Sequence, residues 1–152
     1  VVPKYETNKK GYSWDTANED EISFDRVYVA SEHDSAAHIN QKLNEVDHVV
    51  LQPGTYKLSE PIKINKDRQV ILGIGMPTLQ STHGNAVIEV GDHVGVRVAG
   101  VIMEPGSNTS GETLLKWGTN SNSGSEREPG VISDVFARVG GPHHSSQSEV
   151  QV

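Results

Sequence analysis

The chain has 152 residues, of which 34% are hydrophobic, and its 13 Lys and Arg against 20 Asp and Glu give a formal charge of −7. This length suits one domain with a core of its own, and the negative charge disfavours a nucleic-acid surface, which needs a concentrated positive field. No apolar stretch approaches the roughly 18 residues that cross a bilayer, and the sequence contains no cysteine. We therefore expect neither a nucleic acid nor a membrane as partner, and no disulfides.

The chain opens with a polar segment over residues 1–21, which we interpret as an irregular N-terminal flap. Apolar and polar residues then alternate over residues 22–30, a pattern that predicts a strand. Its predicted inward side chains are Ile22, Phe24, Val27 and Val29, the last two after a bulge.

A short helix is predicted next, because Ala36, Ile39 and Leu43 fall on one helical face and either Asp34 or Ser35 can act as the N-cap. A helix of this length is marginal in isolation and needs packing to hold it. We expect it to cover the open end of a sheet stack, where bare strand edges would promote aggregation.

Short apolar runs recur after this helix, beginning near Val49, Val70, Val96 and Val131 at intervals of 21, 26 and 35 residues. Such spacing is typical of a solenoid whose coils carry loops of unequal length. Parallel strands buried in a stack read as β-branched runs rather than strict alternation, as these do. The longest loop spans residues 106–127 and is interrupted by a short strand over 114–117.

These segments resemble the opening of the pectate-lyase-like right-handed parallel β-helix proteins. The resemblance to the wider fold rests on Asp34–Asn40, Val49–Tyr56 with its Pro-Gly-Thr-Tyr motif, Pro61–Ile62 and Val70–Gly73. A narrower resemblance, carried by Ser23–Ala30 and Gly130–Pro142, is to a secreted microbial group often labelled coagulation-factor-5/8-type or adenylyl-cyclase-like.

The resemblance implies an all-β fold, a right-handed parallel β-helix whose N-terminal coils occupy residues 22–152 and whose short N-terminal helix caps them. It also implies a secreted protein that acts on a polysaccharide. In that group the matching segment is only the first part of a longer β-helix. We therefore expect this chain to be a fragment, or a processed piece whose coils continue on a second chain after Val152.

Catalysis of glycan hydrolysis needs two carboxyl groups about 5–10 Å apart. Acids at equivalent places on successive coils could reach this separation, because stacked strands lie about 4.8 Å apart. Asp134 is the candidate catalytic residue, since it interrupts an apolar strand within the resembling segment. The alternative is a structural role in which Asp134 points outward or caps a turn.

Substrate-binding candidates are Trp117, Arg97 and Arg138. Trp117 adjoins the long polar loop, where an exposed indole would stack on a sugar, although it could also pack beneath that loop. Arg97 and Arg138 lie in strand patterns and could bind an acidic sugar or a carboxylate of the next coil. Solvated, outward-facing arginines are the alternative.

A metal or cofactor is not expected. The seven histidines show no His-x-x-x-His pair, and the adjacent His143 and His144 would point to opposite sides of an extended segment, which disfavours zinc. Lyases of this fold use Ca²⁺ held by clustered Asp, but the sequence lacks an Asp-x-Asp pair, so calcium has only weak support.

Two functional hypotheses remain open. The first is a part of a secreted carbohydrate-active protein, of glycoside hydrolase rather than lyase type. The second is a non-catalytic structural or glycan-binding module that assembles with another chain. The sequence leaves open whether the chain is an enzyme. A hydrolase predicts acids from two coils converging near Trp117 or Asp134, and an assembly module predicts an apolar end face at Val150–Val152.

Overall fold

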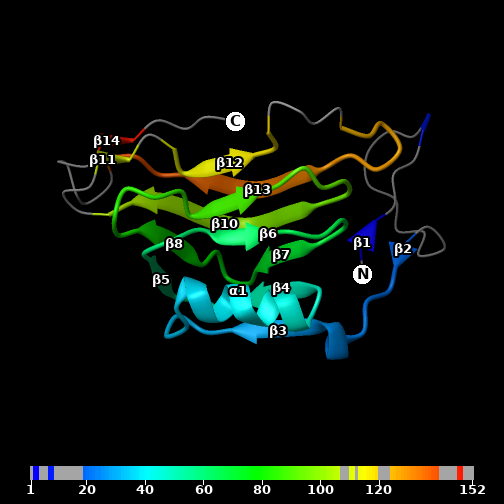
Figure 1. Ribbon diagram of the computed structural model, residues 1–152, viewed down its shortest axis with the longest axis horizontal. Helices are drawn as coiled ribbons and strands as arrows, with labels where there is room; N and C mark the ends of the chain where they lie inside the picture. Colours follow the sequence, from blue (N-terminus) through cyan, green and yellow to red (C-terminus); the bar gives the residue numbers. More distant parts are fainter. Residues whose placement is uncertain are drawn as a thin grey trace.

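The structure of the protein is a computed structural model. It describes residues 2–3, 7–8, 19–106, 110–111, 113–119, 124–140 and 147–148. The described chain is mostly β, and its strands run parallel in a stack that fits a parallel β-helix (Figure 1). The elements are β1 (Val2–Pro3), β2 (Glu19–Asp20), a 3-10 turn (Phe24–Arg26), β3 (Val27–Ala30), α1 (Ala36–Glu45), β4 (His48–Leu51), β5 (Thr55–Leu58), β6 (Ile62–Ile64), β7 (Val70–Gly73), β8 (Thr78–Ser81), β9 (Ile88–Val90), β10 (Arg97–Pro105), β11 (Ser110–Gly111), β12 (Leu115–Trp117), β13 (Val131–Ala137) and β14 (Gln147–Ser148).

Successive coils build three faces. The first face stacks β3, β4, β7 and the N-terminal parts of β10 and β13. The second face stacks β5, β8 and the C-terminal parts of β10 and β13. The third face stacks β6, β9 and β12. Every one of these pairings is parallel, as the continuous apolar runs predict.

One strand serves two faces because β10 bends at Gly100. Residues 97–99 pair with β7, whereas residues 102–105 pair with β8. Gly100 has a φ of 71°, and a Cβ placed there would lie 2.5 Å from the carbonyl oxygen of Gly73 on the coil beside it. Only glycine fits this corner, since it accepts the left-handed conformation and leaves room for the neighbouring backbone.

The core is a set of inward rows in register across the coils. Val49, Ile71 and Val98 align on the first face, and all three are fully buried. The predicted runs began near Val49, Val70 and Val96, whereas the residues that align with Val49 come one or two positions after those starts. The equivalent inward rows of the other two faces are Tyr56, Leu79 and Met103, and Ile62, Ile88 and Leu115.

The predicted helix is present as α1, which packs against β3, β4 and β6. Ser35 is the N-cap, its Oγ accepting from the His38 amide at 3.2 Å, while Ala36, Ile39 and Leu43 are buried. The Asn40 side chain donates to the Pro61 carbonyl at 2.9 Å and accepts from the Lys63 amide at 2.8 Å. These bonds satisfy backbone groups at the free edge of β6, which would otherwise be an unpaired strand edge.

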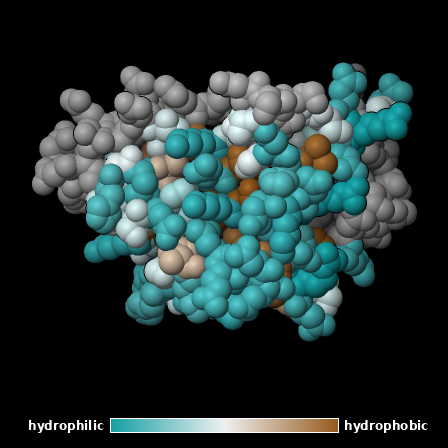
Figure 2. All heavy atoms as spheres, viewed as in Figure 1, coloured by the Kyte–Doolittle hydropathy of each residue, from teal (hydrophilic) through white to brown (hydrophobic). Residues whose placement is uncertain are grey.

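The outer surface of α1 and the third face is largely hydrophilic, with apolar atoms visible only between polar side chains (Figure 2). On the third face Lys63, Glu89 and Lys116 form an outward row in register across three coils. In the described part of the chain, no helix is long and apolar enough to span a membrane.

The Pro-Gly-Thr-Tyr motif is a corner between the first and second faces. Tyr56 is fully buried, and its hydroxyl lies 2.9 Å from the Ala30 carbonyl oxygen and 3.0 Å from that of Gln52. The Glu32 carboxylate accepts from the Thr55 amide at 2.9 Å. The motif therefore ties coil to coil through side-chain bonds to the backbone.

The prediction for residues 22–30 was partly wrong. Ser23 caps the 3-10 turn, its carbonyl accepting from the Arg26 amide at 3.1 Å, so the strand begins only at Val27. Phe24 is consequently 72% exposed, and Val29 points outward, while Ala30 is buried and Tyr28 packs against the core. An alternating pattern cannot distinguish a strand from a turn that precedes one.

The ends of the chain lie mostly outside the described residues. Within the predicted flap, β1 pairs antiparallel with β2. The short strand expected in the 106–127 loop is confirmed as β12. Val150–Val152, where an assembly module would present an apolar end face, fall outside the described residues.

Candidate functional site

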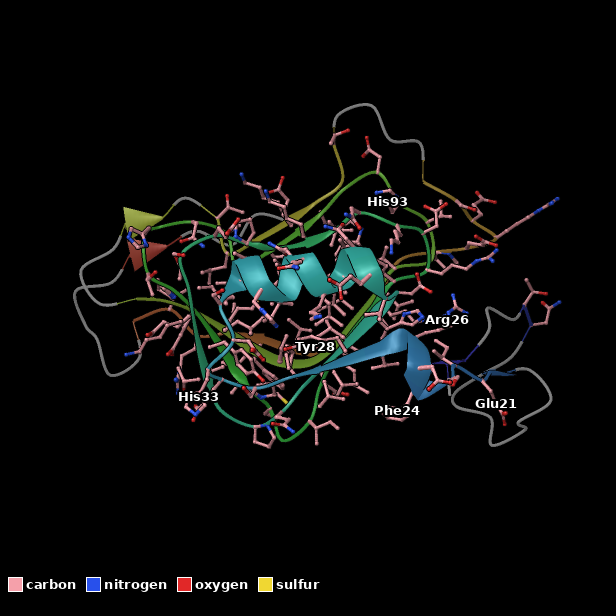
Figure 3. The ribbon with its side chains drawn as sticks, turned by 60° about the horizontal axis from the view of Figure 1, so that its bottom comes forward. Glu21, Phe24, Arg26, Tyr28, His33 and His93 are labelled. Atoms are coloured by element: carbon pink, nitrogen blue, oxygen red, sulfur yellow. The ribbon has the colours of Figure 1, made fainter. Side chains whose placement is uncertain are left out.

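A cleft of about 990 Å³ opens beside the N-terminal ends of the first-face strands. Its walls bring together basic and acidic side chains from successive coils, in a chain whose net charge is negative. In Figure 3, Arg26 and Glu21 lie at the end of the molecule where β3 begins, and His33 lies toward the other end. The basic residues of the cleft are Arg26, Lys66, Arg68, Arg97 and Arg127, and the acidic ones are Glu21, Asp47, Asp67 and Glu128.

Ion pairs between coils organise these charges. Arg26 Nε donates to Asp47 at 2.7 Å, and Arg68 pairs with Glu128. Lys66 Nζ lies 3.4 Å from Asp47 and also donates to the carbonyl oxygens of Leu43, at 3.0 Å, and Val46, at 3.2 Å, where α1 ends. Lys66 thereby satisfies carbonyl groups that a helix C-terminus leaves open.

Two carboxyl groups of this cleft, those of Asp47 and Asp67, have lowered pKa values and so favour ionisation. The hydrogen bond from Arg26 lowers the pKa of Asp47, although partial burial opposes it. The hydrogen bond from the Val94 amide, with that from His93, lowers the pKa of Asp67. A glycosidase general acid needs the opposite shift, a raised pKa. Asp47 and Asp67 therefore suit the recognition of hydroxyl groups better than proton donation.

His48 lies at the inner wall and is only 7% exposed. Its Nδ1 accepts from the Val70 amide at 3.2 Å, so the neutral ring carries its proton on Nε2. Burial lowers the pKa of this imidazole, with the charges of Arg26 and Lys66 acting in the same direction and Asp47 opposing them. His48 is therefore a neutral hydrogen-bonding group.

Asp134 occupies a corner of the coil. It lies between Ser133 and Val135, which pair with Ala99 and Val101, so it stacks beside Gly100. Like Gly100 it has a positive φ, of 51°, a conformation that Asp tolerates better than most residues. Its side chain is exposed. The corner gives a structural reason for an acid here, and the catalytic assignment stays a prediction.

Arg138 belongs to a polar ladder on the second face, formed by Gln80, Glu104 and Arg138 on three successive coils. Two Arg138 nitrogens contact the same Glu104 oxygen, Nε at 2.7 Å and an Nη at 2.5 Å. Glu104 is 6% exposed, and its other oxygen accepts from Gln80 Nε2 at 3.0 Å. Of the two uses proposed for Arg138, the contact to a carboxylate of the neighbouring coil is thus present.

Trp117 is half-buried and packs against the core. A Cβ placed on Gly130 would lie 2.6 Å from its indole ring, so glycine at position 130 allows the chain to cross the ring closely. This contact accords with the packing interpretation.

Arg97 lines the cleft and stands opposite Val131 on the next coil.

The four predicted residues do not form a single site. Arg97 and Trp117 both border the 129–131 segment beside the cleft, Asp134 lies at the next corner, and Arg138 lies beyond the end of β13. Sequence reasoning missed Gln80 as the ladder's third member. Aligning the coils residue by residue would have found it, because Gln80 and Glu104 share a register.

Among the described residues, no group of three His, Asp or Glu side chains is placed to hold a metal ion. The described chain instead offers paired charges, amides and hydroxyls along its coils, which are groups that bind by hydrogen bonding.

Comparison with known proteins identifies the family. A model of the LAM55 pectate lyase-like domain matches residues 27–152. The chain belongs to this family.

Its relatives include a curated exo-beta-1,3-glucanase from Streptomyces sp. (strain SirexAA-E / ActE), 35% identical over 143 residues, which are 92% of this chain and 24% of that protein. The structure of sacteLam55A from Streptomyces sp. SirexAA-E superposes with a TM-score of 0.82 at 34% identity, covering 92% of this chain and 26% of that one. A variant of sacteLam55A in complex with glucose gives 0.80 at 34% identity, covering 90% and 25%. The LAM55-family chain thus spans about a quarter of these relatives' length.

Proposed function

We propose that this LAM55-family chain is part of a secreted, glycoside hydrolase-like protein that acts on a β-1,3-linked glucan. The observation that carries the proposal is the 35% identity to an exo-beta-1,3-glucanase along 92% of the chain. The proposal includes a right-handed winding of the coils, with α1 as their N-terminal cap. It also includes the expectation from the sequence that the chain is similar to the secreted microbial group labelled coagulation-factor-5/8-type or adenylyl-cyclase-like.

The surface chemistry supports a neutral glycan ligand. Asp47, Glu104 and Glu128 are each paired with arginine, so their charges are largely compensated. Paired ions keep hydrogen-bonding capacity while presenting little net field, which suits sugar hydroxyls. In this proposal Arg97, Arg138 and Trp117 contact the sugar, and neither Ca²⁺ nor another cofactor takes part.

Asp134 is the proposed catalytic carboxylate on this chain. Hydrolysis needs two carboxyl groups across the scissile bond. The proposal does not require both of them here, because the chain spans about a quarter of its relatives. Asp134 lies at an exposed corner, where a carboxylate from elsewhere could face it.

A second candidate, a non-catalytic module that assembles with another chain, is favoured by one observation. Ile132 is 42% exposed although it occupies the register of the buried Val98, and Val139 is 45% exposed two residues after Ala137, which pairs with the buried Met103. Within the described part of the chain, the inward row of β13 is therefore incompletely covered. A coil from a second chain would cover it.

The test is to incubate the purified protein with a soluble β-1,3-glucan and with a β-1,4-glucan of similar length. Glucose release and binding are both measured, the first by sugar analysis and the second by isothermal titration calorimetry. We expect binding that is selective for the β-1,3-glucan. A folded protein that neither binds nor cleaves it would overturn the proposal, and selective binding without cleavage would support the module.

A further inference from the structure

We propose that the outer side of the second face is a glucan-binding platform, built from Phe136 and the polar ladder of Gln80, Glu104 and Arg138. This inference rests on the proposed function and names the surface that contacts the sugar. The structural observation behind it is one exposed aromatic ring beside a row of interlocked planar polar groups.

Phe136 faces outward from the sheet and is 58% exposed. It is in register with Ile102, which in turn aligns with Thr78 and Thr55 on the earlier coils. The next residues along these strands, Met103, Leu79 and Tyr56, are the ones that point into the core. Because side chains alternate across a strand, the Phe136 row must project to the outer side.

This exposure differs in origin from that of Ile132. Ile132 lies in an inward row and would be covered by any further coil stacked on β13. The Phe136 ring stands on the flank of the stack, so coils added above β13 would extend its row without covering it. The ring therefore stays accessible to a ligand whether or not further coils follow.

The polar ladder runs parallel to the Phe136 row and is one row away, because Glu104 and Gln80 come two residues after Ile102 and Thr78. Residues two apart on a strand are about 6.6 Å apart, and neighbouring coils about 4.8 Å. The ring and the ladder are thus spaced for one sugar unit to contact both. A pyranose offers an apolar C–H face to an aromatic ring and hydroxyl groups at its edge.

The ladder is held rigidly and leaves both donors and acceptors available. Glu104 is buried and acceptor-only, so it holds the Arg138 guanidinium on one side and orients the Gln80 amide on the other. Gln80 Nε2 faces Glu104, which turns Gln80 Oε1 away from the ladder as an acceptor. The Arg138 side chain is 48% exposed, and its remaining N–H groups are donors. Sugar hydroxyl groups both donate and accept hydrogen bonds, so they match this combination of acceptor and donor groups.

The deciding experiment measures the affinity of Phe136→Leu for a soluble β-1,3-gluco-oligosaccharide by calorimetry. Leucine keeps the apolar bulk and removes the ring, so we expect affinity to fall at least about fivefold, the size of an aromatic contact. The Phe136→Tyr variant keeps an aromatic ring and should bind the oligosaccharide with near wild-type affinity. Phe24→Leu is the matched control, since Phe24 is also exposed, on the turn before β3, and should bind like the wild type.

A second variant, Arg138→Lys, separates the ladder from the ring. Lysine can still pair with Glu104 but lacks the planar array of donors, so affinity should fall while the unfolding midpoint changes little. If the wild type binds the glucan and both Phe136→Leu and Arg138→Lys bind equally well, the platform and the sugar contact of Arg138 are overturned, whereas the proposed action on a β-1,3-glucan stands. If the folded wild type shows no glucan binding, the proposed function fails first.

Discussion

Single residues in this protein connect one coil to the next, and Tyr56 does so from inside the core. Its hydroxyl reaches the Ala30 and Gln52 carbonyl oxygens and is shielded from water. Tyr56→Phe would leave a buried carbonyl without this donor, which costs about 1–2 kcal/mol of unfolding free energy. Urea denaturation measures the change. Tyr28→Phe is the control and should cost less, because Tyr28 is only half-buried and water can replace its hydrogen bond to Asp34.

A single substitution at Asp134 distinguishes a structural role from a catalytic one. Glycine adopts a positive φ without strain, so Asp134→Gly should leave stability unchanged or raise it by up to about 1 kcal/mol. If Asp134 is catalytic, the same variant should lose glucan hydrolysis while remaining folded. Thermal unfolding and sugar release, measured on the same preparation, check both. Retained hydrolysis would remove Asp134 from the proposed mechanism.

His48 predicts a pH dependence of stability. Its pKa in the folded protein lies below the ordinary value of 6.5, because burial disfavours the imidazolium. Around these pKa values the unfolded chain binds more protons than the folded protein. The contribution of His48 to the unfolding free energy is therefore full above pH 6.5 and is lost as the pH falls through the folded-state pKa. The pKa of Asp47 is lowered from 3.8 and that of Glu45 from 4.5, so both carboxyl groups titrate below this window.

The test compares wild type with His48→Asn, whose amide oxygen can accept from the Val70 amide without titrating. Between about pH 7.5 and 5.5, the wild type should lose more unfolding free energy than the variant. Parallel pH profiles would contradict the assignment of this effect to His48.

Among the elements, helix α1 is joined to the edge strand β6 by the side chain of Asn40. Asn40 bonds to the Pro61 carbonyl and the Lys63 amide. Asn40→Ala removes both bonds and should lower the unfolding free energy by about 1–3 kcal/mol, since backbone groups at the edge lose their partners. Its neighbour Gln41 is exposed, so Gln41→Ala should change stability little. Equal effects of the two variants would contradict the edge-covering role.

Sequence reasoning predicted the elements whose signals are local. The Ser35-capped helix and the apolar runs of β4 and β7 follow from capping and burial, which a short window of sequence contains. The register between the coils and the 3-10 turn at Phe24 were not predictable in this way. Both depend on which backbone groups a neighbouring coil supplies, and that partner is about two dozen residues away.

The candidate site was less predictable than the fold for the same reason. Arg138 was identified, but its partner Glu104 and the outward position of Phe136 depend on coil alignment. Asp134 stood out as a polar interruption, and the structure shows that a corner also requires an unusual residue there. An exceptional residue in a repeat can therefore mark geometry as readily as chemistry.

At the scale of the whole molecule, stability is distributed coil by coil. β7, β8 and β9 each pair with a strand on both sides, whereas β3 and β13 pair on one side among the described residues. Amides of the doubly paired coil should therefore exchange with deuterium most slowly, because opening them requires breaking two interfaces. Hydrogen-exchange mass spectrometry tests this order. Uniform protection from β3 to β13 would mean that the described coils unfold as one unit.

The corner between the first and second faces varies in length while the strands on either side keep their register. Residues 73–77 span it on one coil, whereas residues 100–101 suffice on the next. This junction therefore tolerates added backbone, and a foreign peptide inserted after Ile74 would be displayed on the flank of an otherwise unchanged scaffold. The same tolerance offers natural variants a place to acquire new loops without rebuilding the interior.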